Sequence, residues 1–329
     1  MSRTGIIYGI NGPVVYLKGD SGFKMSEMVY VGEQRLVGEV ISLTKDTTTI
    51  QVFEETTGLK PGAVVEGSGD ALSVVLGPGI LNNIFDGIER PLSEIARQSG
   101  DYITRGVSVD SLNTEKKWNV HVTVKTGDKL NGGAIIAETQ ETHSILHKSM
   151  VPPDLSGTVT WAAPDGEYTI IDPIVKLKTS DGKEKTLTLC QKWPIRVPRP
   201  TQKRYPASEP LVTGQRILDT MFPIAKGGTA AIPGGFGTGK TMLQHQIAKW
   251  SNADIIIYIG CGERGNEMTQ VLEEFQELTD PRTGNPLMDR TALIANTSNM
   301  PVAAREASIY TGLTLAEYYR DMGYDVAIM

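Results

Sequence analysis

One stretch, residues 233–250, places several glycines directly before a lysine, a threonine and an amphipathic segment: PGGFGTGKTMLQHQIAKW. Read as Gly-x4-Gly-Lys-Thr, it is the pattern of a phosphate-binding loop. Glycines allow backbone N–H groups to turn toward phosphate oxygens, and the dipole of the following helix favours anions. Lys240 is expected to reach the β and γ phosphates, and the Thr241 hydroxyl to ligate Mg²⁺. The predicted nucleotide-binding residues are Gly234, Gly235, Phe236, Gly237, Thr238, Gly239, Lys240 and Thr241.

Hydrolysis also needs a group that activates water, and GCGERGNE offers a carboxylate. Glu263 follows a predicted strand, and ligands bind at the carboxyl edge of a parallel sheet. From position alone, Glu263 is equally a water-activating base or an acid at a helix N-terminus. Arg264 is a candidate phosphate contact or a support for one, and Glu267 is interpreted as a surface or capping acid. Cys261 is predicted to be a small buried residue at the strand end.

The segments around these motifs alternate between strands and helices from residue 227 onward. Strands are predicted at TAAIP, DIIIYIGCG, TALIANTS and DVAIM, and the second is apolar enough to be covered on both faces. Helices are predicted from Lys240, with Leu243, Ile247 and Trp250 as its apolar stripe, then around residues 268–275, and over 301–322. This alternation predicts a parallel α/β sheet.

The preceding residues are rich in short β patterns. Residues 1–75 predict a small antiparallel barrel or sandwich, residues 76–113 read as a linker, and residues 116–190 as a second β-rich module. The proline-rich KWPIRVPRPTQKRYP predicts an extended connector. We predict a multidomain α/β and β protein with domains at 1–73 (β-barrel), 74–113 (linker and start of the nucleotide-binding domain), 114–190 (β-rich insertion) and 191–329 (a parallel α/β domain with the phosphate-binding loop).

Composition narrows the class of protein. The 329 residues are 40% hydrophobic and 21% charged, with no apolar run long enough to cross a membrane, which indicates a cytoplasmic-type protein. The net charge is -6, and residues 1–75 carry six Lys or Arg against nine Asp or Glu. That balance argues against nucleic acid as a partner, and so against an RNA-translocating RecA-like hexamer.

Several stretches resemble the catalytic A subunit of V-type and archaeal A-type rotary ATPases: GPGILNNIFDGIERPL, GGFGTGKTMLQHQIAKW, YIGCGERGNEMTQVLEEF and the segment from DPRTGNPLMDR to RDMGYDVA. The resemblance runs the whole length, including the insertion. It implies a crown barrel and a RecA-like domain, and it places Lys240, Thr241, Glu263 and Arg264 on family positions for phosphate, magnesium, water activation and γ-phosphate contact. This favours the catalytic interpretation of Glu263.

The resemblance also implies ATP or ADP and Mg²⁺ as ligands. Expected partners are B-type subunits in an alternating hexameric ring, central and peripheral stalk subunits, and a membrane sector that moves protons or sodium, which gives a cytoplasmic location peripheral to the membrane. A neighbouring B-type subunit is expected to supply an arginine to the site. A noncatalytic ring subunit is the alternative, but it would lack the intact Gly-Lys-Thr or Glu263.

Two loop residues and the end of the chain depart from the family pattern. Gly235 stands where Ala or Pro is usual, and Thr238 where eukaryotic members commonly have cysteine. The magnesium-shell aspartate, the adenine pocket and the C-terminal helical domain would lie beyond Met329. The sequence is therefore expected to be a fragment or a truncated product.

Overall fold

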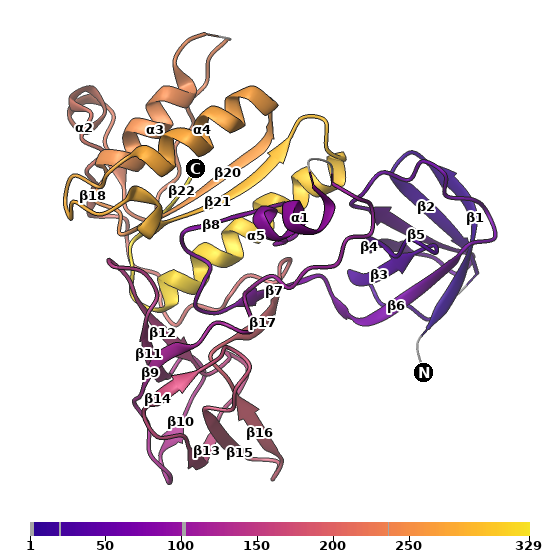
Figure 1. The fold of residues 1–329 in the computed structure, drawn as a ribbon, viewed down its shortest axis with the longest axis horizontal. Coiled ribbons are helices and arrows are strands. Elements are labelled where there is room, and N and C mark those ends of the chain that lie inside the picture. The colour runs from indigo at the N-terminus through magenta and orange to yellow at the C-terminus, as the bar shows by residue number, and fades with distance from the viewer. Residues whose placement is uncertain (1–2, 20, 101–102, 236) are drawn as a thin grey trace.

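The computed structural model describes residues 3–19, 21–100, 103–235 and 237–329. Figure 1 shows three bodies: a barrel at the right, a β-rich insertion at the lower left, and an α/β unit above the insertion. The predicted combination of a β-barrel, a β-rich insertion and a partial parallel α/β domain is confirmed. The residue boundaries between these domains stay predictions.

The N-terminal body is a closed six-stranded barrel with strand order β1-β2-β5-β4-β3-β6. Alternate residues point inward, so the side chains along β5 are half-buried and fully buried by turns. The inward side chains form one apolar core that includes Val15, Val29, Val40 and Ile50. The strands are β1 (Thr4–Asn11), β2 (Val14–Lys18), β3 (Glu27–Val31), β4 (Leu36–Leu43), β5 (Thr47–Val52) and β6 (Val64–Ala71).

The insertion consists of two antiparallel four-stranded sheets, in the orders β12-β11-β9-β14 and β10-β13-β15-β16. Its core is continuous with that of the α/β unit, because Ile136 and Val159 belong to the same buried cluster as Ile255 and Leu315. The strands are β9 (Trp118–Val122), β10 (Lys129–Leu130), β11 (Ile135–Gln140), β12 (Leu146–Met150), β13 (Gly157–Ala162), β14 (Gly166–Tyr168), β15 (Val175–Thr179) and β16 (Glu184–Leu187).

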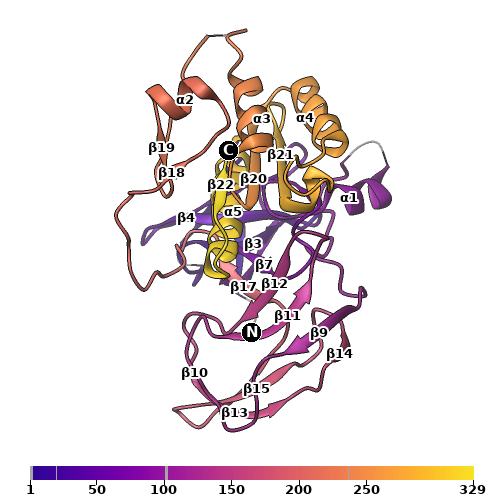
Figure 2. The ribbon, with the colours of Figure 1, turned by 90° about the vertical axis from the view of Figure 1, so that its left-hand side faces the viewer.

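The α/β unit is built on a parallel sheet with the order β22-β20-β21-β8. Its strands are β8 (Asn83–Phe85), β20 (Ile255–Glu263), β21 (Thr291–Thr297) and β22 (Val326–Ile328). In β20, Ile255 and Ile257 pack in the cluster that contains α5 residues, and Ile256 and Tyr258 pack in the cluster that contains α3 and α4 residues. Helices thus cover both faces, as predicted (Figures 1 and 2). The three helices are α3 (Lys240–Trp250), α4 (Gly265–Glu277) and α5 (Val302–Asp321).

Shorter elements complete the described structure. β7 (Ser73–Leu76) pairs antiparallel with β17 (Gln191–Pro194), which brings the chain before and after the insertion together. The others are α1 (Leu92–Ser99), β18 (Pro210–Leu211), α2 (Arg216–Met221), β19 (Ile224–Ala225) and the 3₁₀ turn η1 (Leu287–Arg290). No helix within the described ranges has the length and apolar content that crossing a membrane requires.

Two expectations about local structure were wrong. TAAIP, residues 229–233, is not a strand; it is mostly exposed, so it gains too little burial to offset the entropy of ordering an extended segment. On α3, Ile247 is buried with His245 and Ala248, whereas Trp250 is 47% exposed. The proline-rich connector is extended at its start, where β17 contains its first three residues and pairs with β7 in a two-stranded sheet.

Arg196 ties the barrel to the α/β unit. Its Nε and Nη2 donate to the two carboxylate oxygens of Glu39 on β4 at 2.7 and 2.8 Å, and its Nη1 donates to Glu306 on α5 at 3.1 Å. The Glu39 side chain is only 2% exposed, so its charge depends on this partner. The contact therefore holds two bodies in one arrangement.

Replacing Arg196 by methionine is expected to cost about 3 to 5 kcal/mol, because Glu39 is left buried without its counter-charge. The matched control is Arg35→Met, which removes an ion pair to Glu66 whose side chains are 55% and 46% exposed; its expected cost is about 0 to 1 kcal/mol. Urea denaturation followed by circular dichroism measures both. Equal losses in the two variants would contradict the assignment.

Candidate nucleotide-binding site

The glycine-rich loop lies directly before α3, as predicted from its motif. Gly237 and Gly239 have φ values of 74° and 80°, a left-handed conformation that strains residues with a side chain. A Cβ on Gly234 would lie 2.5 Å from the Thr238 Oγ1, so this close approach also needs glycine. Thr238 donates from that hydroxyl to the Gly235 carbonyl at 2.9 Å, which closes the loop. Phe236, named with these residues from the sequence, lies outside the described residues.

Lys240 and Thr241 occupy the first turn of α3. The Lys240 Nζ donates to the carbonyls of Gly234 and Gly235, the latter at 3.0 Å, so the lysine folds back over its own loop. Thr241 is half-buried, and its hydroxyl makes no hydrogen bond with any described residue. A helix N-terminus, a lysine and an uncommitted hydroxyl are together suited to an oxyanion and a hard cation.

Glu263 is the last residue of β20, at the carboxyl edge of the sheet. The pKa of its carboxyl is raised above the usual value, first by a hydrogen bond with the carboxyl of Glu267, then by partial burial and the charge of Glu267. The positive charges of Arg264 and Lys240 act in the opposite direction. The loop lysine and this glutamate belong to the same α/β unit, Lys240 at the start of α3 and Glu263 at the end of β20.

Glu267 is a site residue whose pairing sequence reasoning missed. It lies in the first turn of α4, where a capping acid was predicted. It also shares a hydrogen bond with Glu263 and lies 3.7 Å from the Arg264 guanidinium. Glu263 and Glu267 are four residues apart, a spacing that places side chains together on a helix. Because Glu263 ends a strand and Glu267 lies on the following helix, that rule could not be applied here.

A second missed residue is Arg305, in the first turn of α5. It donates to the carbonyls of Ser298 and Met300, and its side chain packs against Gly262, where a Cβ would lie 3.1 Å from the Arg305 Cδ. Arg305 thus lies against the residue that precedes Glu263. The signal that could have found it is its position: it begins the helix after the third strand, at the same carboxyl edge.

Cys261 was expected to be buried at the end of β20, and that expectation was wrong. Its side chain is exposed, and its Sγ donates to the Arg305 carbonyl at 3.4 Å. The strand is irregular here: its pairing with β21 shifts register between Cys261 and Glu263, with Gly262 at a φ of 75° between them. Such a bulge changes the direction in which the following side chains point.

Buried polar contacts hold α3 in place below the loop. His245 on α3 pairs with Glu274 on α4, with 2.9 Å between Nδ1 and Oε2. At the other end of α3, the fully buried Arg290 donates to the carbonyls of Ala248 and Lys249, which lie in its last turn. A cation at a helix C-terminus complements the helix dipole. The two helices that flank the site therefore have fixed positions.

The fit to Mg²⁺ depends on Thr241. Within the described ranges, no group of three or more His, Cys, Asp or Glu side chains is placed to hold a metal ion. A threonine hydroxyl with no other hydrogen bond is compatible with Mg²⁺, which is often held by one or two protein oxygens together with substrate phosphates and water. The residues present thus fit a metal that arrives with a nucleotide.

Three family models match consecutive parts of the chain. The beta-barrel domain of the ATP synthase alpha/beta family matches residues 7–69, the barrel-sandwich domain of the ATP synthase alpha/beta subunit matches 109–196, and the nucleotide-binding domain of the family matches 214–329. The three bodies of the fold thus each correspond to a domain of one family.

Curated relatives align with the whole chain. It is 58% identical to the V-type ATP synthase alpha chain of Halothermothrix orenii over 100% of its residues and 56% of the relative. It is 60% identical to V-type ATP synthase alpha chain 2 of Clostridium tetani and 58% identical to the A-type ATP synthase A subunit of Methanopyrus kandleri, in each case over 100% of this chain and 55% of the relative. The chain thus spans just over half the length of these relatives.

A solved structure has the same fold. The assembled ATPase EscN of the enteropathogenic E. coli type III secretion system superimposes with a TM-score of 0.60 at 20% identity, covering 99% of this chain and 56% of that one. At this identity the likeness concerns the fold. The sequence matches decide the family: the chain belongs to the ATP synthase alpha/beta family, in the group of V-type alpha chains and A-type A subunits.

Proposed function

We propose that this chain forms the phosphate-binding and water-activating part of the catalytic subunit of a rotary V/A-type ATPase. That enzyme couples ATP hydrolysis or synthesis to proton or sodium transport. The observation that carries the proposal is the position of the phosphate loop, which ends at Lys240 in the first turn of α3, in the same α/β unit as Glu263 at the carboxyl end of β20. The relatives named as V-type and A-type ATP synthase subunits support it.

Each residue has a proposed task in this site. Loop amides from about Gly235 to Thr241 bind the phosphate oxygens, with Lys240 on the β and γ phosphates. Glu263 accepts a proton from the attacking water, and Arg264 contacts the γ-phosphate. Thr241 would hold Mg²⁺, whose positive charge would offset the charge of the phosphates.

The proposed partners follow from the family. B-type subunits alternate with this subunit in a hexameric ring, where a neighbouring chain supplies an arginine to the developing charge on the phosphoryl group. Central and peripheral stalk subunits connect the ring to a membrane sector, so that the subunit lies in the cytoplasm at the membrane. A noncatalytic ring subunit is disfavoured because the Gly-Lys-Thr sequence and Glu263 are both intact.

Glu263→Gln in the assembled enzyme is expected to lower ATP turnover at least about 100-fold, the contribution of a positioned general base. Binding of ATP should stay near the parent value, because the loop and its lysine are unchanged. Steady-state hydrolysis and equilibrium binding of a labelled nucleotide measure the two quantities. Glu273→Gln, on an exposed position of α4, is the matched control. Normal turnover in Glu263→Gln would refute the proposal.

The pairing with Glu267 leads to a prediction about pH. Because Glu267 raises the pKa of Glu263, the base becomes protonated, and activity falls, at a higher pH than it would alone. Glu267→Gln removes the charge and offers an amide N–H to the carboxylate. The pKa of Glu263 should therefore fall, and the acid limb of the pH–rate profile should move to lower pH.

The measurement is kcat against pH for the parent enzyme, for Glu267→Gln and for Glu273→Gln. The control should reproduce the acid limb of the parent. An acid limb that stays in place in Glu267→Gln would mean that Glu267 does not tune the base.

A further inference from the structure

A fully buried glutamate lies near the point where the three bodies of the fold meet. Glu89 belongs to the loop between β8 and α1. Its Oε2 accepts the N–H of Val75 on β7 at 2.6 Å. Because β7 pairs with β17, this bond reaches the strands at which the chain enters and leaves the insertion. The φ of Glu89 is 65°, a strained conformation for a residue with a side chain, which persists only where the surrounding contacts hold it.

The same loop is tied to the barrel by an arginine that pairs with two other carboxylates. Arg90 donates from Nε to Asp86 at 2.7 Å, and from Nη1 to Glu54, just after β5, at 3.4 Å. Asp86 is 3% exposed and Glu54 is 8% exposed, so both carboxylates depend on this cation. Among the described side chains, the bonds of Arg90 go to these two acids, and none goes to Glu89.

Within the described ranges, Glu89 forms no ion pair. The charged group that acts on it is Asp86 on the same loop, which is negative. β7 carries no charged side chain, and Lys192 on β17 is exposed. The segment before β9 contributes the Ser111 hydroxyl, which hydrogen-bonds the carboxyl. α5 contributes the uncharged Thr311, whose hydroxyl donates to the loop backbone at 2.9 Å. The surroundings of Glu89 thus supply polar donors but no counter-charge.

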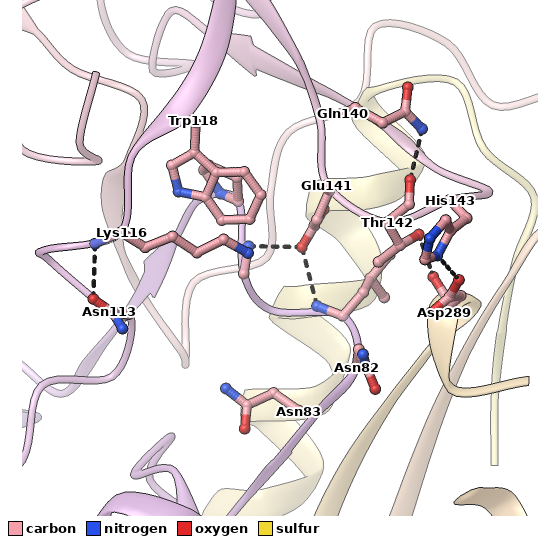
Figure 3. Close-up of a pocket in the computed structure, with 13 residues that line it drawn as sticks. Asn82, Asn83, Asn113, Lys116, Trp118, Gln140, Glu141, Thr142, His143 and Asp289 are labelled. Atoms are coloured by element: carbon pink, nitrogen blue, oxygen red, sulfur yellow. Dashed lines mark hydrogen bonds and ion pairs between the residues drawn. The ribbon is translucent and has the colours of Figure 1, made fainter. Parts of the chain in front are cut away.

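A second buried glutamate shows what Glu89 lacks. Glu141, which follows β11, accepts hydrogen bonds from two backbone N–H groups and from the Tyr319 hydroxyl. Figure 3 also shows the Lys116 ammonium beside it, and this positive charge acts on Glu141. Glu89 has one backbone N–H, one hydroxyl and no cation. Of the two buried acids, Glu89 therefore has the weaker support for a negative charge.

A carboxylate buried without a counter-charge is costly, so such a group keeps its proton instead. Burial accordingly raises the pKa of Glu89 to about 8. The Val75 N–H and the Ser111 hydroxyl oppose this rise, and the negative charge of Asp86 adds to it. A glutamate in water has a pKa of about 4.3. The folded loop therefore binds a proton that the same side chain would release in water.

We propose that Glu89 is a proton-binding site that latches the junction between the barrel, the insertion and the α/β unit. As a neutral acid it keeps the loop between β8 and α1 packed against β7. When the loop leaves β7, the carboxyl enters water and releases its proton. A rise in pH through the neutral range therefore favours opening of this junction.

Opening of the junction releases a proton, so its equilibrium depends on pH. Between about pH 5 and pH 8, the closed form holds a proton that the open form has lost. The equilibrium constant for opening should therefore rise about tenfold for each pH unit in that window. Above about pH 8 both forms are ionised, and the rise should end.

The test measures hydrogen exchange at the backbone amides of residues 73–91 by mass spectrometry, from about pH 6 to about pH 9, with correction for the intrinsic exchange rate. The parent chain is compared with Glu89→Gln, which has the shape of the neutral acid, keeps an acceptor for the Val75 N–H and does not titrate. Protection in the parent, relative to this variant, should fall about tenfold per pH unit up to about pH 8 and then stay constant.

Glu115→Gln is the matched control, because Glu115 is exposed. Its protection should follow that of the parent at every pH. The carboxyl ¹³C signal of Glu89 in the parent gives a second reading, with an expected midpoint near pH 8. A ratio of protection that does not change with pH, a Glu89→Gln variant that fails to fold, or a carboxyl midpoint near that of a glutamate in water would each overturn the inference.

Discussion

The burial of β20 on both faces is the constraint on which the other parts depend. Its side chains alternate between the core beside α5 and the core beside α3 and α4, so that neither helix layer can shift without exposing apolar surface. The parallel pairing with β21 and β22 fixes where this strand ends. Glu263 and the first turn of α4 are consequently held at one edge, beside the loop that begins α3.

The packing of β20 also fixes the insertion, because the 20-residue helix α5 extends from the candidate site to the insertion. Its first turn carries Arg305, which packs against Gly262 near the site. Near its other end, the fully buried Tyr319 donates its hydroxyl to Glu141 of the insertion, and the Tyr318 hydroxyl lies 3.2 Å from His147 Nε2. Burial lowers the pKa of His147 to about 3, which keeps the ring neutral in the core. Movement of the insertion would break these contacts, so α5 and the insertion behave as one packed unit.

The sequence was sufficient for elements whose pattern is local. The apolar run of β20, the periodicity of α4 and α5 and the glycine motif each depend on neighbouring residues, and the structure contains all of them. The sequence was insufficient where contacts between residues far apart in the chain determine the structure. β8 joins the parallel sheet from within an apparent linker because β21 offers it a free edge. Glu267 and Arg305 were missed as members of the site, since only the fold brings them beside Glu263 and Gly262.

Local charge at the site differs from that of the whole chain. The chain has a net charge of -6, yet the positive charges of Lys240 and Arg264 both act on Glu263, against the negative charge of Glu267. In the proposed function, bound phosphates bring negative charge beside Glu263, which by itself would raise the pKa of the base and keep it protonated. The cations counter that effect while they bind the anion. A glutamate base is therefore compatible with a phosphate site here because the loop lysine and Arg264 serve both requirements.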